Sequence, residues 1–102
     1  MTIDKDYFMS KLDRICAYIS TSREEDFDLL AKSTVWFFDG KLSEDDLECC
    51  LESVKTNRPN NEVAYFCASL RNRMQLSSRE MNLLIRRTRV PSFLQRRGNG
   101  MR

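Results

Sequence analysis

Apolar residues recur along this chain with the spacing of an α-helix, and no segment shows the alternation of a β-strand. The first stripe consists of Phe8, Leu12, Ile15, Cys16 and Ile19, whose spacing places them on one helix face. The later stripes are Phe27, Leu30, Ala31, Thr34, Val35 and Phe38; Leu47, Cys50, Leu51 and Val54; Val63, Phe66, Cys67, Leu70 and Met74; and Met81, Leu84 and Ile85. This pattern predicts an all-α fold, a compact bundle of about five helices with a basic C-terminal tail.

Polar residues between the stripes predict where the helices begin and end. Ser22 with Glu25 fits a capping box, in which a hydroxyl and a carboxylate satisfy exposed amide groups at a helix start. Gly40 is expected to end the same helix in the left-handed conformation. Ser43 precedes three acidic residues, which favour the positive end of a helix dipole, and Ser77 precedes the fifth stripe.

The length of 102 residues suits one domain. Val90-Pro91 is expected to stop the last helix, so residues 1–91 are predicted to form a single helical domain and residues 92–102 a basic, flexible tail. No apolar run approaches the roughly 20 residues of a membrane span, and the first residues do not resemble a signal peptide. We therefore expect a cytoplasmic protein without membrane contact.

Missing residue types argue against catalysis. The chain has no histidine, which removes the usual general base and the usual nitrogen ligand of zinc. The four cysteines contain no C-x-x-C pair, and three of them lie on apolar stripes, where cysteine acts as a small hydrophobe. Asp45 and Asp46 could hold a metal, but acids in a first helical turn usually serve the dipole. We expect no enzyme activity, no metal and no cofactor.

Charge is distributed unevenly along the chain. Residues 1–57 carry seven basic and 13 acidic groups, a net charge of −6, whereas residues 58–102 carry ten arginines and two acids, a net charge of +8. Guanidinium groups are planar, permanently charged and able to fork onto phosphate. The sequence therefore predicts a nucleic-acid-binding surface, with DNA favoured over RNA. The candidate binding residues are Arg71, Arg73, Arg79, Arg86, Arg87, Arg89, Arg96 and Arg97.

Two binding geometries are open. In one, Glu62–Met74 and Arg79–Thr88 form a helix-turn-helix, with Arg79 and Asn82 facing base edges. In the other, the last helix and the tail lie along the phosphates without reading bases. We favour the second, because Arg79 and Asn82 are the only plausible readers near that helix start.

Residues 43–73 resemble the C-terminal module of DnaD-like replication initiation proteins. An acidic helix beginning at Ser43 is followed by a polar turn and by a helix that carries Tyr65, Phe66, Leu70, Arg71 and Asn72 at the matching positions. The pattern departs at Ser69, where the family has an aliphatic residue, and at Arg73, where it has an aromatic one. The resemblance implies a DNA-binding accessory of replication initiation or helicase loading in a bacterium or mobile element, with a helicase as a partner.

An alternative function is a helical adaptor or inhibitor that binds a protein. It would use an acidic surface or an exposed aromatic patch, in which the aromatic rings could also stack on bases. The acids are Glu24, Glu25, Asp26, Asp28, Asp45, Asp46 and Glu48. The aromatic residues are Trp36, Phe37 and Tyr65, for which a place in a widened core face is the favoured interpretation and the exposed patch the alternative. In a further interpretation, the arginines pair with the acidic half, within one molecule or across a homo-oligomer.

Overall fold

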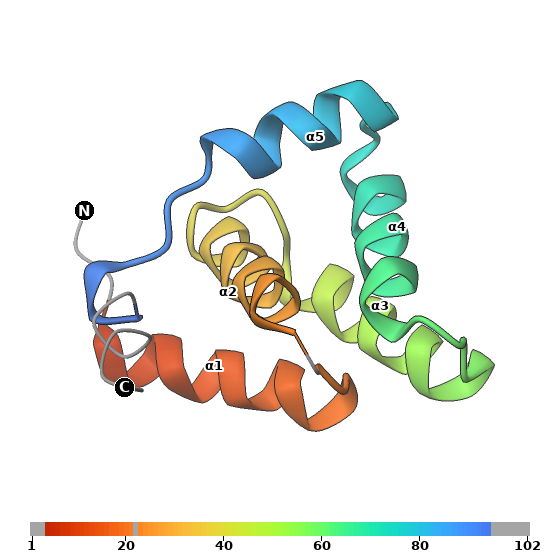
Figure 1. The fold of residues 1–102 in the computed structure, drawn as a ribbon, viewed down its shortest axis with the longest axis horizontal. Helices are drawn as coiled ribbons and strands as arrows, with labels where there is room; N and C mark the ends of the chain where they lie inside the picture. The colour runs from red at the N-terminus through yellow and green to blue at the C-terminus, as the bar shows by residue number, and fades with distance from the viewer. Residues whose placement is uncertain (1–3, 22, 95–102) are drawn as a thin grey trace.

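The computed structural model describes residues 4–21 and 23–94, and these ranges contain helices but no strand (Figure 1). The helices are α1 (Lys5–Tyr18), α2 (Glu24–Phe38), α3 (Glu44–Asn57), α4 (Glu62–Met74) and α5 (Ser78–Arg87). Helix α2 lies between α1 and α5, and α3 and α4 close the bundle at one side (Figure 1). The prediction of an all-α bundle is confirmed. Across the described ranges, no helix has both the length and the apolar character that a membrane span requires.

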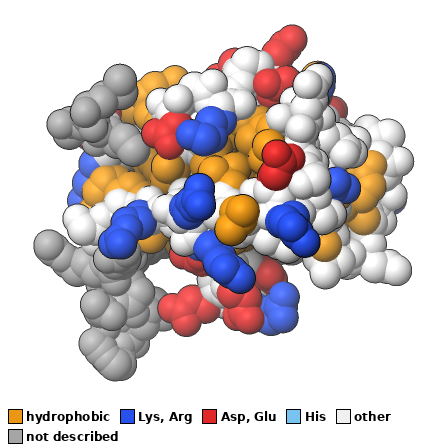
Figure 2. All heavy atoms as spheres, turned by 90° about the horizontal axis from the view of Figure 1, so that it is seen from above, with side chains coloured by type: hydrophobic (Ala, Val, Ile, Leu, Met, Phe, Trp, Pro, Cys, Tyr) orange, Lys and Arg blue, Asp and Glu red, His pale blue; other side chains and the backbone are white. Residues whose placement is uncertain are grey.

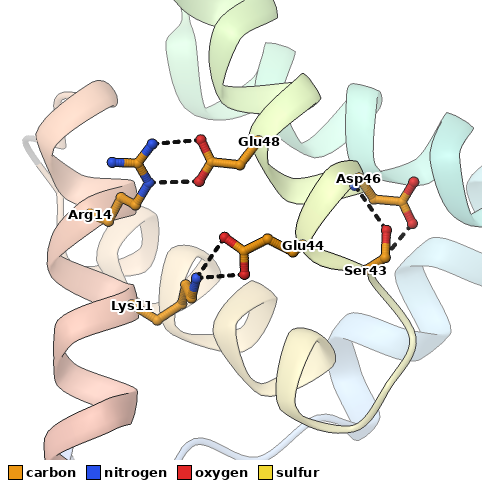
Figure 3. A network of polar contacts seen from close by, with 6 residues as sticks. All are labelled: Lys11, Arg14, Ser43, Glu44, Asp46 and Glu48. Carbon is orange, nitrogen blue, oxygen red and sulfur yellow. Dashed lines mark hydrogen bonds and ion pairs between the residues drawn. The ribbon is translucent and has the colours of Figure 1, made fainter.

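Two helix starts carry the reciprocal hydrogen bonds of a capping box. The Ser43 hydroxyl accepts the Asp46 amide at 3.0 Å while the Asp46 carboxylate accepts the Ser43 amide at 3.1 Å (Figure 3). Ser77 and Glu80 make the same pair of bonds at the start of α5. The predicted starts of α3 and α5 are confirmed, and each capping box satisfies two amide groups at the start of its helix.

Helix α2 begins differently from the prediction. Its N-cap is Arg23, one residue after the serine that the sequence predicts, and Arg23 makes no side-chain cap hydrogen bond. The expected capping box depends on Ser22, which lies outside the described residues. The three acids of its first turn still favour the positive end of the dipole. At the other end, Gly40 follows the C-cap with a φ of 86°, as the sequence predicts.

Most of the buried apolar side chains come from the predicted stripes of the five helices, and Leu42 and Leu94 are buried outside those stripes. Trp36 is also buried, with an exposed fraction of only 1%, so its ring widens the core and does not form part of a surface patch. The largest fully buried side chains are Trp36, Phe8, Phe66, Leu12, Ile15, Ile19, Leu30, Leu47, Leu51, Leu70 and Val54.

The segment after Pro91 begins on the core and not as a tail. Residues 92–94 form a helical turn, in which Leu94 is buried and the Phe93 ring lies edge-on to Phe8, with 5.6 Å between ring centroids. The domain therefore extends at least to Leu94, because Phe93 and Leu94 pack against the core although both follow Pro91. The rest of the expected tail, including Arg96 and Arg97, lies outside the described residues.

Two ion pairs join α1 to α3 across the bundle (Figure 3). The Lys11 ammonium donates to Glu44 at 2.9 Å, and the Arg14 guanidinium donates through two nitrogens to both Glu48 oxygens at 2.6 Å. Paired donation of this kind fits the planar fork of arginine. The hydrogen bond from Arg14 lowers the pKa of Glu48, and the same bond raises the pKa of Arg14.

The Glu48 pair makes stability depend on acidity in a defined direction. The pKa of the Glu48 carboxyl group is lower in the folded chain than the unfolded value of about 4.3. The contribution of the ion pair to stability is therefore complete above that value and is lost as the pH falls through the lower folded pKa. Glu48→Gln should therefore reduce the melting temperature at pH 7, and this difference should disappear on acidification. Circular dichroism melts from about pH 7 to pH 2 measure it. The control is Glu52→Gln, since no cation of the described chain pairs with that carboxylate; a pH-independent difference for Glu48→Gln would contradict the account.

Candidate nucleic-acid interface

Helix α5 is attached to the core along one side. Met81 is its only buried residue, and Leu84 and Ile85 are half-buried beside it. The Trp36 indole N–H donates to the Thr88 hydroxyl at 2.7 Å, which fixes the end of α5 to α2. Lys32, also on α2, donates to the Ile85 carbonyl at 2.9 Å. These contacts fix which face of α5 points outward.

The outward face of α5 carries Arg79, Asn82, Leu83 and Arg86, which are all exposed. Their spacing of three, four and seven positions places them on one side of the helix, opposite Met81. Figure 2 views the side of the molecule on which α5 lies and shows several Lys and Arg side chains across its middle, with hydrophobic side chains and a few Asp or Glu side chains among them. We call this set, extended by the exposed Arg87 and Arg89, the α5 face.

The four arginines of the α5 face have no carboxylate partner among the described residues. Every ion pair among the described residues uses a cation other than these four. Beyond residue 57, Arg73 is the one described arginine in an ion pair, at 3.8 Å from Asp46. Pairing with the acidic half inside one molecule therefore does not account for Arg79, Arg86, Arg87 or Arg89. Their charges are available to a partner.

The helix dipole explains only some of these positions. Arg86 and Arg87 lie in the last turn of α5, where cations are favourable by about 0.3–1 kcal/mol each. Arg79 lies in the first turn, where the same dipole disfavours a cation. The acid of the same turn, Glu80, makes the capping box with Ser77, and the neighbours one turn on are Asn82 and Leu83, so none of these side chains forms an ion pair with Arg79. An external anion is the partner that this position suits.

The other predicted arginines on α4 are engaged inside the molecule. Arg71 is half-buried and donates to the Leu76 carbonyl at 3.5 Å, within the turn before α5. Arg73 pairs with Asp46 and also lies beside Cys49, which raises its pKa. Between α4, α5 and the loop after α2 is an open depression of about 570 Å³. Its lining includes Lys41, Arg73, Glu80, Leu83 and Arg87, so it extends the basic character of the α5 face.

The aromatic candidates do not form one exposed patch. Trp36 is in the core, as described above. Phe37 is half-buried, its ring packs edge-on against Phe38, and the Lys11 ammonium lies 4.7 Å from its centroid. The Tyr65 hydroxyl accepts from the Asn57 side-chain amide at 2.8 Å on the seam between α3 and α4. None of the three rings lies on α5.

Most of the predicted acidic surface is used in internal ion pairs. Arg23 pairs with Asp26 at 3.2 Å, and Lys32 pairs with Asp28 at 3.2 Å. Glu24 and Asp45 are the two acids of the predicted set for which the described residues supply no ion pair. The pairs of the other five are Glu25 and Asp26 with Arg23, Asp28 with Lys32, Asp46 with Arg73, and Glu48 with Arg14. Within this predicted set, therefore, only Glu24 and Asp45 keep a charge that no ion pair of the described residues uses.

The cysteines do not assemble a reactive centre in the part of the chain that the structure describes. No group of three histidine, cysteine, aspartate or glutamate side chains there could hold a metal ion. Cys49 is exposed, whereas its neighbour Cys50 is buried. Burial raises the pKa of Cys50 to about 11, so its thiol is protonated at neutral pH.

Sequence reasoning missed three residues of this region. Leu83 is 39% exposed on the α5 face, and its position away from the inner stripe of Met81, Leu84 and Ile85 could have indicated this. Lys41 reaches the depression from a loop that the sequence does not place near α5. Nothing in the spacing of Lys32 shows that it binds the Ile85 carbonyl.

These observations define an all-α protein with one arginine-rich helical face. No protein-family model matches the chain, and comparison with curated proteins and with solved structures also gives no match.

Proposed function

We propose that this chain is a non-catalytic DNA-binding accessory protein that grips phosphates through the α5 face. The observation that carries the proposal is the exposure of Arg79, Arg86, Arg87 and Arg89 without a carboxylate partner among the described residues. Unpaired guanidinium groups on one face repel each other, and phosphates remove that repulsion while accepting forked hydrogen bonds. Arg96 and Arg97, which follow in the sequence, would add to the same charge.

A protein partner is the weaker candidate. Five of the seven acids that would form its docking surface already face a cation of this chain. The resemblance of residues 43–73 to DnaD-like modules supports a role in replication initiation or helicase loading in the cytoplasm of a bacterium or mobile element. A helicase is the protein partner that such a role would require.

The dependence of binding on salt tests this proposal. Three phosphate contacts from Arg86, Arg87 and Arg89 predict a slope of about −2.7 for log affinity against log salt on duplex DNA, and Arg96 and Arg97 would make it steeper. Affinity should then fall at least about 40-fold between 50 and 200 mM salt. Fluorescence anisotropy with a labelled DNA of mixed sequence measures both values. No binding at the lower salt, or binding that ignores salt, would overturn the proposal.

A further inference from the structure

We infer that the DNA bound by the α5 face is a duplex, and that α5 enters its major groove with Arg79 and Asn82 at base edges. This inference rests on the proposed function and adds the form of DNA and the direction of approach. It differs from a helix that lies along the phosphates, which needs no groove and no particular strand form.

The first support is the connection between α4 and α5. Only Gln75, Leu76 and Ser77 separate the two helices, which is a turn length typical of the helix-turn-helix motif. Gln75 is left-handed, with a φ of 59°. The amides of Gln75 and Leu76 donate to the carbonyls of Asn72 and Arg71, each at 3.1 Å. Arg71 also donates to the Leu76 carbonyl at 3.5 Å, so three hydrogen bonds within the turn support the angle at which α5 leaves α4 (Figure 1).

The second support is the fit of α5 to a groove. Its 10 residues make a rod about 15 Å long and about 10–12 Å across with its side chains, which matches a major groove about 12 Å wide. The helix buries only Met81 against the bundle, and it lies at the edge of the fold (Figure 1). A helix held by one narrow side leaves the rest of its circumference to the groove walls.

The third support is the chemistry along the outward stripe. Arg79 and Asn82 occupy the N-terminal half, from which recognition helices reach bases. A guanidinium can fork onto guanine, a carboxamide can pair with adenine, and an apolar side chain such as Leu83 can contact the thymine methyl group. Arg86, Arg87 and Arg89 follow at the other end, where they would reach phosphates. Base-edge chemistry and phosphate chemistry are thus separated along one helix.

A single strand is a poorer partner for this face. Proteins that bind single strands stack bases on exposed aromatic rings. Helix α5 contains no aromatic residue. The Trp36 ring, whose N–H donates to Thr88 at the end of α5, is only 1% exposed. Because α5 offers no aromatic ring for unpaired bases to stack on, a single strand would contact it only through phosphates, and a duplex makes those contacts as well.

The experiment compares three labelled probes of one sequence and length with the full chain. They are a duplex DNA, its single strand, and the same duplex with glucosylated hydroxymethylcytosine, which fills the major groove and leaves the phosphate charge unchanged. The plain duplex should bind tightest, and glucosylation should weaken binding at least about tenfold. Arg79→Ala removes the guanidinium that would fork onto guanine, so this variant should lose about 5- to 150-fold of the preference for a site selected from random duplexes.

Equal affinity for the plain and glucosylated duplexes would overturn groove entry while leaving the phosphate grip intact. Equal or tighter binding of the single strand would overturn it in the same way. Absence of binding to every probe would overturn the proposed function as well. Lys55→Ala, which removes one cation from α3, serves as the matched control and should leave the order of the three probes unchanged.

Discussion

Replacement of Arg86, Arg87 and Arg89 by alanine together is expected to abolish DNA binding. Each hydrogen bond to a charged group contributes about 1.5–3 kcal/mol, so the loss of three should weaken affinity at least about a thousandfold. The fold should persist, because all three side chains are exposed and α5 retains its capping box and its buried Met81. Anisotropy measures the binding, and the far-UV circular dichroism spectrum checks that the helices remain.

A variant of equal charge change separates a specific grip from general attraction. Lys5, Arg23 and Lys55 are exposed cations of the N-terminal half, and their replacement by alanine removes the same three charges. This control should lose less than about tenfold in affinity, since distant charges are screened within about 10 Å at 0.1 M salt. If the two triple variants bound equally well, net charge and not the α5 face would determine binding.

Trp36→Ala is expected to have the largest effect on stability. Its ring is 1% exposed, and removal of a buried aromatic side chain costs about 3–5 kcal/mol. That is a large part of the roughly 5–15 kcal/mol that keeps a domain of this size folded. Urea denaturation followed by circular dichroism measures the loss. A loss below about 1 kcal/mol would contradict the position of Trp36 in the core.

Thr88→Val separates the packing of Trp36 from its hydrogen bond. Valine has nearly the shape of threonine but cannot accept from the Trp36 indole N–H, which would then be buried without a partner. The expected cost is about 1–3 kcal/mol, less than that of Trp36→Ala. Since Trp36 is the only tryptophan of the chain, its fluorescence follows unfolding of the Thr88→Val variant directly. An unchanged free energy of unfolding would show that the bond does not attach α5 to α2.

The helices were predictable because their signals are local. Apolar spacing placed the buried faces of α1, α3 and α4 correctly, and Ser43 and Ser77 marked two helix starts through side chains three residues apart. The start of α2 was less predictable, because its N-cap is Arg23, which makes no side-chain cap hydrogen bond that a sequence pattern could indicate. The course of the chain after Pro91 was not predictable, because it depends on the Phe93 ring meeting Phe8 from the other end of the sequence.

The candidate site was predictable in composition but not in arrangement. Sequence spacing identified Arg79 and Arg86 as members of a basic region, and the α5 face contains both. It could not show that Arg71 and Arg73 are engaged inside the molecule, since their partners Leu76 and Asp46 are placed by the fold. The sequence favoured a helix that lies along the phosphates. The hydrogen-bonded turn of three residues before α5 is the structural feature that favours entry into the major groove instead.

An NMR titration of the isotope-labelled chain with duplex DNA tests the central claim most directly, because it reports every amide and the arginine side-chain N–H groups at once. The account predicts that the shifts that change most belong to Arg79, Asn82, Arg86, Arg87 and Arg89, while those of Glu24 and Asp45 stay in place. Changes confined to the acidic half, or no change in α5 while other residues respond, would contradict it.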